Sequence, residues 1–501
     1  MISLADRIGA AERALALGVS GVVVALRGLT LLVEHLPLPV GSLVRIEMAN
    51  GQMANGKSRQ GRRSSDLPFV DLPFAISPGV PGEIVGFDAG RAIVMVMGST
   101  EGIRPGDRVV GEQTSQSAPI GPGLLGRVID GLGRPIDGLG PVHDTAPRPI
   151  MPAPAPAMRR RRINRALHTG VRAIDLFATL GRGQRIGIFS GPGVGKSTLL
   201  GQIARASDAD VNVIALVGER GREVRDFIET VLGPGGLAKS VVVVATSDES
   251  PLLRLRAAKV ACAAAEWFRD QGQDALLVMD SVTRFAHAQR QVGLSVGEPP
   301  ATRGYTPSVF ASLPLLLERA GALEGAGSIT GLYTILVEGD DLTEPVADAC
   351  RGVLDGHLIL DRDLAERGHY PALDVLASVS RIAEDVTDER HAHARRQILR
   401  LLAAHRKSED LIQIGAYARG SDPETDVAVD YHPRLMELLQ QGRGETEEFE
   451  RARDRLLRIA IETGEKLRVR LAQREAARAK ADVAAQAPAG QGSGAAAGAG
   501  G

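Results

Sequence analysis

The stretch "FSGPGVGKSTLL" at residues 189–200 places Gly191, Gly193 and Gly195 directly before a single lysine, Lys196. Glycine adopts positive φ angles at little cost, so such a loop can turn several backbone N–H groups toward one anion. The apolar run before it suits a buried strand, and the run after it suits a helix whose N-terminus favours negative charge. A strand, a glycine-rich turn and a helix in this order predict a phosphate-binding loop.

The loop also predicts how a nucleotide is held. We expect the nucleotide to contact Ser190, Gly191, Pro192, Gly193, Val194, Gly195, Lys196, Ser197 and Thr198. Lys196 should reach the β- and γ-phosphates, and the Ser197 hydroxyl is placed to bind Mg²⁺. The first position of the general motif is Ser190 here rather than glycine. An ordinary glycine-rich turn between a strand and a helix is the alternative interpretation.

Two carboxylates directly follow apolar, strand-like runs. Glu219 ends the run in "NVIALVGERGREV", and Asp280 ends the run in "ALLVMDSVTRFA". In open parallel sheets, ligands bind beyond the carboxyl ends of the strands. We therefore predict that Asp280 supports Mg²⁺ and that Glu219 orients or deprotonates the attacking water. The alternatives are a surface ion pair of Glu219 with Arg220 or Arg222, and a helix N-cap role for Asp280.

Composition narrows the class of protein. The chain has 501 residues, of which 44% are hydrophobic and 24% charged, and this predicts about three domains of a soluble protein. The 59 basic residues nearly balance the 60 acidic ones, so the chain has no global cationic footprint for nucleic acid. Cys262 and Cys350 lack metal-type spacing and should be reduced core residues of a cytosolic protein. The sequence contains no run of 18 apolar residues, so we predict no membrane-spanning helix.

The N-terminal part is expected to hold a helix and a small β domain. Apolar residues recur at spacings of three and four within residues 1–18, and they are Met1, Leu4, Ile8, Ala11 and Leu15. This stripe predicts an amphipathic docking helix, and the alternative is a helix that packs on the chain's own β domain. Short β-like runs with Gly/Pro turns follow across residues 19–115 and predict a barrel or a sandwich. They are interrupted by a polar stretch, about 50–78, that we interpret as a disordered loop.

The remainder predicts an α/β domain followed by helices. We expect a Pro-rich connecting segment at 116–162, an α/β domain with a mostly parallel sheet at 163–385, a helical domain at 386–483 and a disordered Ala/Gly-rich tail at 484–501. The four arginines Arg159 to Arg162 could meet phosphates or lipid, but we expect a solvated linker face there.

Long motifs between Gly82 and about Leu439 point to one family. They include "LLGRVIDGLGRPIDG" from Leu124, "GERGREV" from Gly218, "PPATRGYTPSVFASLPLLLERAG" from Pro299, "GHYPALDVLASVSR" from Gly368 and "SEDLIQIGAYARGSDPETD" from Ser408. These motifs resemble those of the type III secretion ATPases, which comprise flagellar export ATPases and injectisome ATPases and are related to the α and β subunits of rotary ATP synthases. The run "ERAGALEGAGSITGLYTILVEGDD" from Glu318 favours the flagellar branch.

The resemblance assigns roles to further residues. Arg220 matches the arginine beside the water-polarising glutamate, and Tyr370 matches the aromatic side chain that packs on adenine. Arg381, which closes "GHYPALDVLASVSR", matches the arginine finger inserted from a neighbouring subunit. Small residues replace the first loop glycine in this family, so Ser190 fits it. The 50–78 stretch has no counterpart in the family pattern.

The resemblance also implies partners and a location. It implies that the α/β domain at 163–385 is a RecA-like ATPase domain. It also implies a Mg²⁺-dependent ATPase that forms a homohexamer and promotes unfolding, chaperone release and export of flagellar proteins. A regulatory, stator-like export protein would bind the N-terminal helix, and the ring would meet the export gate, substrates and chaperones. The chain would be cytoplasmic and peripheral to the inner membrane.

Other functions stay open at this point. An injectisome ATPase shares almost every motif, and a catalytic subunit of a rotary ATP synthase shares many of them. A ring translocase on nucleic acid is disfavoured because only 3% of the residues are aromatic and could stack on bases. A regulatory, non-hydrolysing subunit is disfavoured because Glu219 is present.

Overall fold

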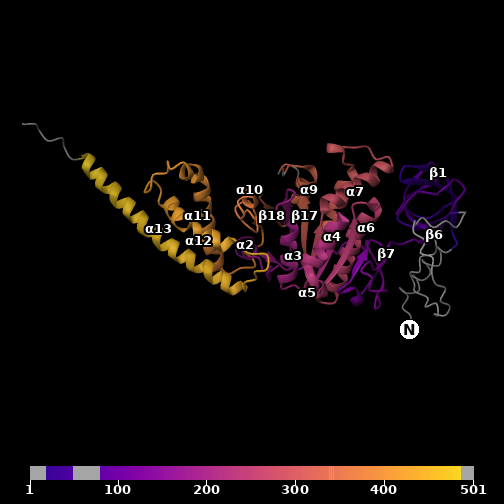
Figure 1. The fold of residues 1–501 in the computed structure, drawn as a ribbon, viewed down its shortest axis with the longest axis horizontal. Coiled ribbons are helices and arrows are strands. Elements are labelled where there is room, and N and C mark those ends of the chain that lie inside the picture. Colours follow the sequence, from indigo (N-terminus) through magenta and orange to yellow (C-terminus); the bar gives the residue numbers. More distant parts are fainter. Residues whose placement is uncertain (1–17, 49–78, 338, 340, 342, 487–501) are drawn as a thin grey trace, which may run out of the picture. The chain divides into compact units, whose positions relative to one another are not determined.

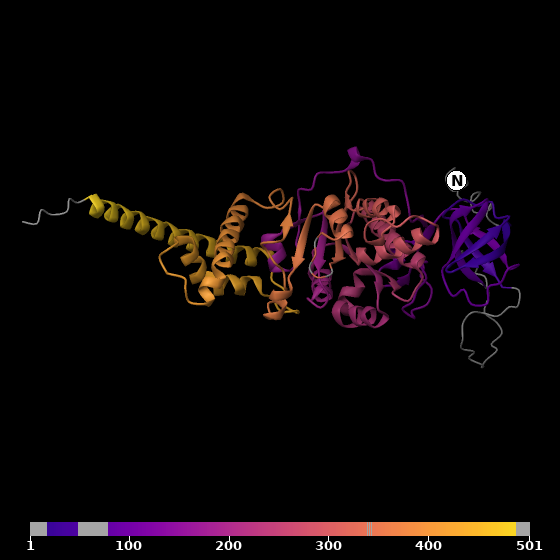
Figure 2. The ribbon, with the colours of Figure 1, turned by 90° about the horizontal axis from the view of Figure 1, so that it is seen from above.

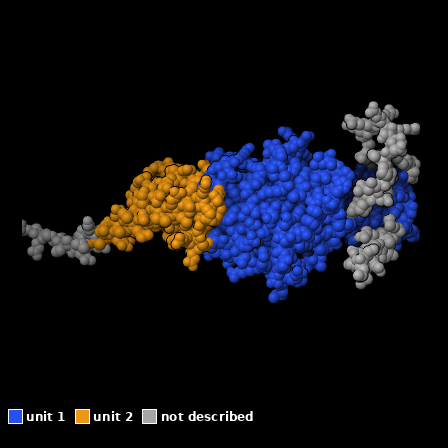
Figure 3. Space-filling model, turned by 90° about the horizontal axis from the view of Figure 1, so that it is seen from below, with its two compact units in different colours: residues 1–387, 441–447 blue, residues 388–440, 448–501 orange. Residues whose placement is uncertain are grey.

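The computed structural model describes residues 18–48, 79–337, 339, 341 and 343–486. The predicted docking helix, apart from Gly18, and the predicted 50–78 loop lie outside this part. The predicted disordered tail at 484–501 lies outside it from residue 487, but its first three residues, 484–486, are helical, so the tail was placed too early in the chain. The described chain divides into two compact units (Figure 3). The first unit runs to Thr387 and also includes Gln441–Glu447. The second unit consists of Asp388–Gln440 and of the chain from Glu448 onward.

A closed β-barrel forms the N-terminal part of the first unit. Its strands are β1 (Ser20–Arg27), β2 (Thr30–Glu34), β3 (Leu43–Glu47), β4 (Val80–Asp88), β5 (Arg91–Val96) and β6 (Arg108–Gln113). They pair in the order β1-β2-β5-β4-β3-β6. The strand pattern alone allowed a barrel or a sandwich, and the small N-terminal β-barrel that we expected is confirmed. Strand β2 was not predicted, because its first four residues are buried and no alternation marks it.

A central α/β domain follows the barrel (Figures 1 and 2). Its main sheet has the order β19-β18-β12-β17-β15-β13-β14-β8. The strands of this sheet are β8 (Val128–Asp130), β12 (Arg185–Ser190), β13 (Val211–Glu219), β14 (Ser240–Thr246), β15 (Asp274–Asp280), β17 (Ser328–Leu336), β18 (Gly356–Leu360) and β19 (Val379–Ser380). All neighbouring strands in this order are parallel to one another except β19, which is antiparallel to β18. The predicted mostly parallel sheet is therefore confirmed.

Helices and short elements complete the domain. The helices are α2 (Arg172–Phe177), α3 (Lys196–Ala206), α4 (Gly221–Asp226), α5 (Gly233–Ala238), α6 (Pro251–Asp270), α7 (Val282–Ser295), α8 (Pro307–Leu317), α9 (Pro345–Val353) and α10 (Arg362–Glu366). The short strands are β7 (Ser117–Ile120), β9 (Ala146–Pro149), β10 (Ala166–Leu167), β11 (Leu180–Gly181) and β16 (Gly321–Ala322). Helix α6 packs on β13, β14 and β15, and its buried face is almost continuous because alanines and leucines occupy it.

The segment expected to connect the barrel to the α/β domain also contributes to the sheet. Residues Val128 to Asp130 form β8, which pairs in parallel with β14. All of its residues are buried, and Ile129 is fully so. A strand of this length leaves no alternation to detect, which is why the sequence indicated only a linker there.

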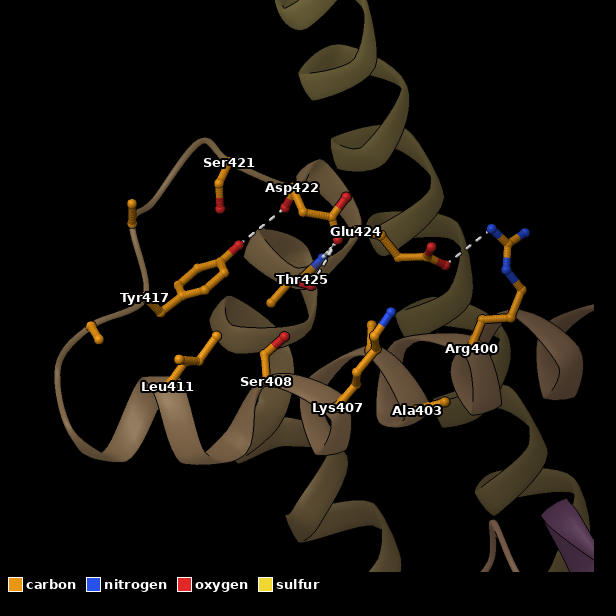
Figure 4. A pocket seen from close by; sticks show the side chains of 13 residues that line it. Arg400, Ala403, Lys407, Ser408, Leu411, Tyr417, Ser421, Asp422, Glu424 and Thr425 are labelled. Carbon is orange, nitrogen blue, oxygen red and sulfur yellow. Dashed lines mark hydrogen bonds and ion pairs between the residues drawn. The ribbon is translucent and has the colours of Figure 1, made fainter.

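The second unit is helical. It contains α11 (Glu389–Gln413), α12 (Pro423–Leu439) and α13 (Phe449–Gln486), which pack on one another. Asp388 and Asp422 cap the first two helices by accepting hydrogen bonds from backbone N–H groups of the first turn. A pocket lies between α11 and α12, where Arg400 forms an ion pair with Glu424 at 3.0 Å (Figure 4). Within the described residues, no helix combines the length and the apolar character that a membrane crossing requires.

Candidate active site

The stretch at 189–200 folds as the predicted strand, turn and helix. Strand β12 ends at Ser190 and α3 begins at Lys196. Gly193 and Gly195 have φ angles of 81° and 94°, a region that residues with a Cβ rarely adopt. The Ser190 side chain is buried, and its hydroxyl has no hydrogen-bond partner among the described residues. The turn therefore presents backbone N–H groups at the N-terminus of α3, where an anion is favoured.

Lys196 lies between the two predicted carboxylates. Its Nζ is 2.5 Å from Asp280 Oδ1 and 3.8 Å from Glu219 Oε1. The three side chains are largely buried, with exposed fractions of 12%, 4% and 15% for Lys196, Asp280 and Glu219. The structure thus brings together the loop lysine and both strand-end carboxylates, which are far apart in the sequence.

Strand order explains why these groups meet. Strand β17 lies between β12 and β15, and β15 lies next to β13, so their carboxyl ends share one edge of the sheet. Thr334 on β17 donates a hydrogen bond from Oγ1 to Asp280 Oδ1 at 2.7 Å. Thr334 lies on the strand between the phosphate loop and Asp280, and its hydrogen bond fixes the Asp280 carboxylate. Sequence reasoning missed Thr334, because one threonine in a buried strand carries no local signal.

The surroundings of Glu219 raise its pKa. Burial is the main cause, the nearby Asp280 carboxylate adds to it, and Lys196 and Arg284 oppose it; together they place the pKa at about 7 instead of 4.5. A carboxylate with a pKa near neutrality can take up and release a proton under physiological conditions. Glu219 therefore has the electrostatics of a group that handles a proton or a water molecule.

Arg284 is a second residue that the sequence reasoning missed. It lies in α7, and its Nε is buried without a partner among the described residues. Gly218 has a φ of 74°, and a Cβ built there would lie 2.9 Å from Arg284 Cβ. The glycine before Glu219 therefore provides room for the arginine. The sequence signal that could have identified Arg284 is its position shortly after Asp280 in "DSVTRF".

The alternative roles for the two carboxylates can now be compared with the structure. Ser281, not Asp280, caps α7, because its side chain accepts a hydrogen bond from the backbone N–H of Arg284. Arg220 pairs with Glu223 at 3.1 Å, and its side chain is 79% exposed. No contact joins Arg220 to Lys196 or Asp280 among the described residues, so this predicted residue is not part of the buried cluster.

Tyr370 lies beside the phosphate loop. A Cβ built at Gly195 would be 3.6 Å from Tyr370 Cε1, which places the ring against the loop. A pocket opens here, lined by Val194, Gly195, Thr198, Tyr370, Gln441 and Arg443, among others. The sequence reasoning did not identify Gln441 and Arg443, because only the folded chain brings the 441–447 segment to this place.

Arg381 lies elsewhere in its own chain. Its backbone N–H donates to the carbonyl of Asp355 at 3.0 Å, just before β18 begins. Strand β18 runs parallel to β12, so Arg381 is at the amino end of the sheet and the phosphate loop is at the carboxyl end. At about 3.3 Å per residue, the length of β12 separates these edges by roughly 16–20 Å. Arg381 and Lys196 therefore do not form one site within a single chain.

The oxygen donors suit magnesium. Mg²⁺ prefers oxygen ligands and commonly binds through one or two carboxylates together with substrate phosphates. Asp280 and the exposed hydroxyl-bearing residue Ser197 flank Lys196, one across the sheet and one in α3. In the part of the chain that the structure describes, no group of three or more His, Cys, Asp or Glu could hold a metal unaided. The donor set fits a metal bound jointly with a nucleotide.

The glycine-rich loop after β12, its lysine and the strand-end carboxylates define a phosphate-loop nucleotide-binding domain. Comparisons with known proteins agree. The nucleotide-binding domain of the ATP synthase alpha/beta family matches residues 170–380, and the beta-barrel domain of that family matches residues 75–112. The T3SS EscN ATPase C-terminal domain matches residues 387–458.

Similar proteins cover most of the chain. The flagellum-specific ATP synthase of Salmonella typhimurium is 50% identical over 74% of this chain and 83% of its own length. The type 3 secretion system ATPase of Xanthomonas euvesicatoria is 50% identical over 72% of this chain and 81% of its own length. The assembled ATPase EscN of enteropathogenic E. coli has the same fold, with a TM-score of 0.78, 37% identity and coverage of 88% of this chain and 100% of EscN.

These likenesses identify the chain as a member of the flagellar and type III secretion ATPases within the ATP synthase alpha/beta family. It is accordingly an ATPase with a barrel, a nucleotide-binding domain and a helical domain.

Proposed function

We propose that the chain is the ATPase of a flagellar type III export apparatus, which hydrolyses Mg²⁺-ATP to promote unfolding, chaperone release and export of flagellar proteins. The observation that carries the proposal is the buried cluster of Lys196, Glu219 and Asp280 in a chain about half identical to flagellum-specific ATP synthases. An injectisome ATPase is the second candidate, because a type 3 secretion ATPase is equally similar.

The phosphate loop binds the nucleotide. The backbone N–H groups of Gly191, Gly193 and Gly195 donate to the phosphates. Lys196 moves from Asp280 to the nucleotide and neutralises charge on the β- and γ-phosphates. Ser197 and Asp280 would hold the metal, which when bound would supply positive charge to the phosphates. Thr334 keeps the Asp280 carboxylate oriented through its hydrogen bond.

Glu219 acts on the attacking water. It follows β13 at the edge of the sheet where the phosphate loop ends, and its pKa near 7 suits a group that must orient water and accept a proton. The cation Arg284 beside it favours the ionised form and steadies its position. Arg220, which is exposed, is available to a ligand or to a neighbouring subunit.

Arg381 completes the site of a neighbouring copy. Its position at the amino end of the sheet supports this role, because the arginine cannot serve the phosphate loop of its own chain from there. An arginine finger stabilises charge on the γ-phosphoryl group and contributes roughly 10³–10⁵ in rate. The chain therefore works as a homohexameric ring, and the solved assembly of EscN supports this arrangement.

Further partners follow from the same role. We infer that the segment at 1–18 binds a stator-like regulator and that a central stalk enters the ring, as EscO is bound to EscN. Export gate, substrates and chaperones meet the ring at the cytoplasmic face of the inner membrane, where the chain is peripheral. Nucleic acid is not a specific partner.

A complementation experiment tests the export role. A strain lacking the chain should regain motility and secretion of flagellar proteins with the wild-type protein, but not with Glu219→Gln. Loss and recovery of injectisome substrates with normal motility would support the second candidate instead. Normal secretion of both substrate classes in the deletion strain would refute both.

A further inference from the structure

Helix α7 passes close to the catalytic edge of the sheet and then runs away from it. It begins directly after Asp280 and Ser281 and carries Arg284 in its first turn. A Cβ built at Gly218, the residue before Glu219, would lie 2.9 Å from Arg284 Cβ, so the helix lies against the strand end that carries the glutamate. The direction of α7 therefore sets the distance between Arg284 and Glu219.

Tyr305 and the residues after it hold the next turns of α7. The Tyr305 ring stacks on the His287 imidazole, with 6.0 Å between the ring centroids, and the Arg290 guanidinium lies 5.2 Å from the centroid of the tyrosine ring. At the start of α8, Ser308 Oγ accepts a hydrogen bond from Gln289 Nε2 at 3.1 Å. The contact of Tyr305 with α7 is therefore part of a continuous support along the helix.

The Tyr305 hydroxyl joins α7 to a third segment. It donates to Glu344 Oε1 at 3.0 Å and lies 3.1 Å from His287 Nε2. A tyrosine hydroxyl has one proton, and Glu344 accepts it, so His287 Nε2 is the donor in the second bond. Tyr305 is 3% exposed, and a buried polar group is costly to leave without a partner. The hydroxyl is therefore the point at which the His287 side chain is fixed.

Glu344 belongs to the chain that leaves the catalytic edge of the sheet. It directly precedes α9, and strand β17 ends a few residues earlier at Leu336. At that strand end, the Leu336 backbone N–H donates to Thr283 Oγ1 of α7 at 2.9 Å. Helix α7 is thus attached to this part of the chain at Thr283 and again, one turn later, through His287 and Tyr305. A helix attached at one point can pivot about it, whereas a second attachment fixes its direction.

We propose that Tyr305 is a positioning residue for ATP hydrolysis, because through His287 it fixes the direction of α7 and so keeps Arg284 beside Glu219. This inference rests on the role proposed for Glu219 in acting on the attacking water. A displacement of about 1 Å that originates far from the reacting atoms can slow a reaction by about 10²-fold, since catalytic groups must be held in one geometry. Tyr305 acts through other side chains and does not itself take part in the reaction.

The first test removes the hydroxyl alone. Tyr305→Phe keeps the ring against His287 and Arg290 but loses both hydrogen bonds. In the full chain, kcat for ATP should fall by roughly tenfold while KM and equilibrium ATP affinity stay within about twofold, because the phosphate loop is untouched. Tyr333→Phe is the matched control, since Tyr333 is also buried and donates its hydroxyl proton to the Leu317 carbonyl, outside this network.

A double-mutant cycle tests whether the hydroxyl acts through Arg284. Changes at residues that act as one unit are not additive, whereas independent effects add. In an Arg284→Ala background, Tyr305→Phe should therefore alter the single-turnover rate by less than about twofold. Single-turnover assays at high enzyme concentration keep slow variants measurable. His287→Gln, which retains a side-chain N–H donor, should lose less activity than His287→Ala.

Three results would overturn the inference. An unchanged kcat in Tyr305→Phe would show that the hydroxyl positions nothing that the reaction needs. Equal losses in the wild-type and Arg284→Ala backgrounds would show that Tyr305 only stabilises the fold, and loss of ATP affinity together with turnover would assign it to nucleotide binding. Absence of hydrolysis by the wild type would instead refute the proposed function, and this result is distinguishable because it does not depend on Tyr305.

Discussion

Lys196 Nζ lies 2.5 Å from Asp280 Oδ1, at the point where the phosphate loop meets the end of a strand two positions away in the sheet. A lysine in this position neutralises one carboxylate fully and a second, Glu219, partly. Removal of the Lys196 side chain would deprive the bound nucleotide of this positive charge. It would also leave the buried carboxylates of Asp280 and Glu219 close together without a cation between them.

Lys196→Ala should reduce ATP turnover by about 10³-fold or more, because no other loop side chain supplies positive charge to the phosphates. Steady-state hydrolysis, with circular dichroism to verify the fold, measures this. Lys239→Ala is a matched control, because Lys239 donates to the Ser207 carbonyl elsewhere in the domain. Turnover near that of the control would contradict the assigned role.

Glu219→Gln should keep nucleotide affinity within a few-fold while turnover falls by about 10²–10⁴-fold, the usual contribution of a general base. The change is isosteric and leaves the phosphate loop untouched. Titration calorimetry with ATP and single-turnover hydrolysis separate the two effects. If affinity were lost together with turnover, Glu219 would be a binding residue.

The raised pKa of Glu219 predicts two pH dependences. The glutamate must be ionised to act on water, so kcat/KM should rise with pH through about 7. The folded state holds this proton more tightly than the unfolded chain, so ionisation of Glu219 should cost stability as pH rises from about 4.5 to about 7.

Glu219→Gln should therefore be more stable than the wild type at pH 8, by on the order of 1 kcal/mol, since one pKa unit corresponds to about 1.4 kcal/mol. The gap should narrow toward pH 5. Thermal unfolding across this pH range measures it, and Glu229→Gln, which changes an exposed glutamate in an ion pair, is the control. A gap independent of pH would show that the pKa is not raised.

Gly218→Ala should reduce kcat by roughly tenfold to a hundredfold, because a Cβ at a φ of 74° and 2.9 Å from Arg284 Cβ must displace the arginine or the Glu219 backbone. Gly221→Ala is the matched control, since a Cβ there meets no heavy atom within 4 Å. Measurement of kcat for both variants tests this prediction. Equal activity of the two variants would show that Arg284 can move away from a Cβ at position 218 without loss of function.

The sequence predicted the part of the site that local patterns encode. The glycine-rich loop and the carboxylates Glu219 and Asp280 follow from strand ends and motif spacing, which do not depend on distant contacts. Tyr370 and Arg381 came from the family resemblance, because neither stands in a pattern with a physical signature.

The missed features depend on tertiary packing. Thr334 acts through the strand order, and Gln441 acts through bonds to Gly170, Arg172 and Tyr370, all distant in the chain. The short strand β8 was missed because its pairing with β14, not its own residues, makes it a strand. Periodicity cannot reveal contacts of this kind.

We propose that the active site is shared between copies of the chain, with Arg381 of one copy acting at Lys196 of the next. The most direct measurement is ATP turnover after mixing Arg381→Ala protein with Lys196→Ala protein, with mass photometry to verify that mixed rings form. Some interfaces would then join an intact loop to an intact arginine, so turnover should exceed that of either variant alone. Mixed rings with turnover no higher than that of the separate variants would contradict the claim.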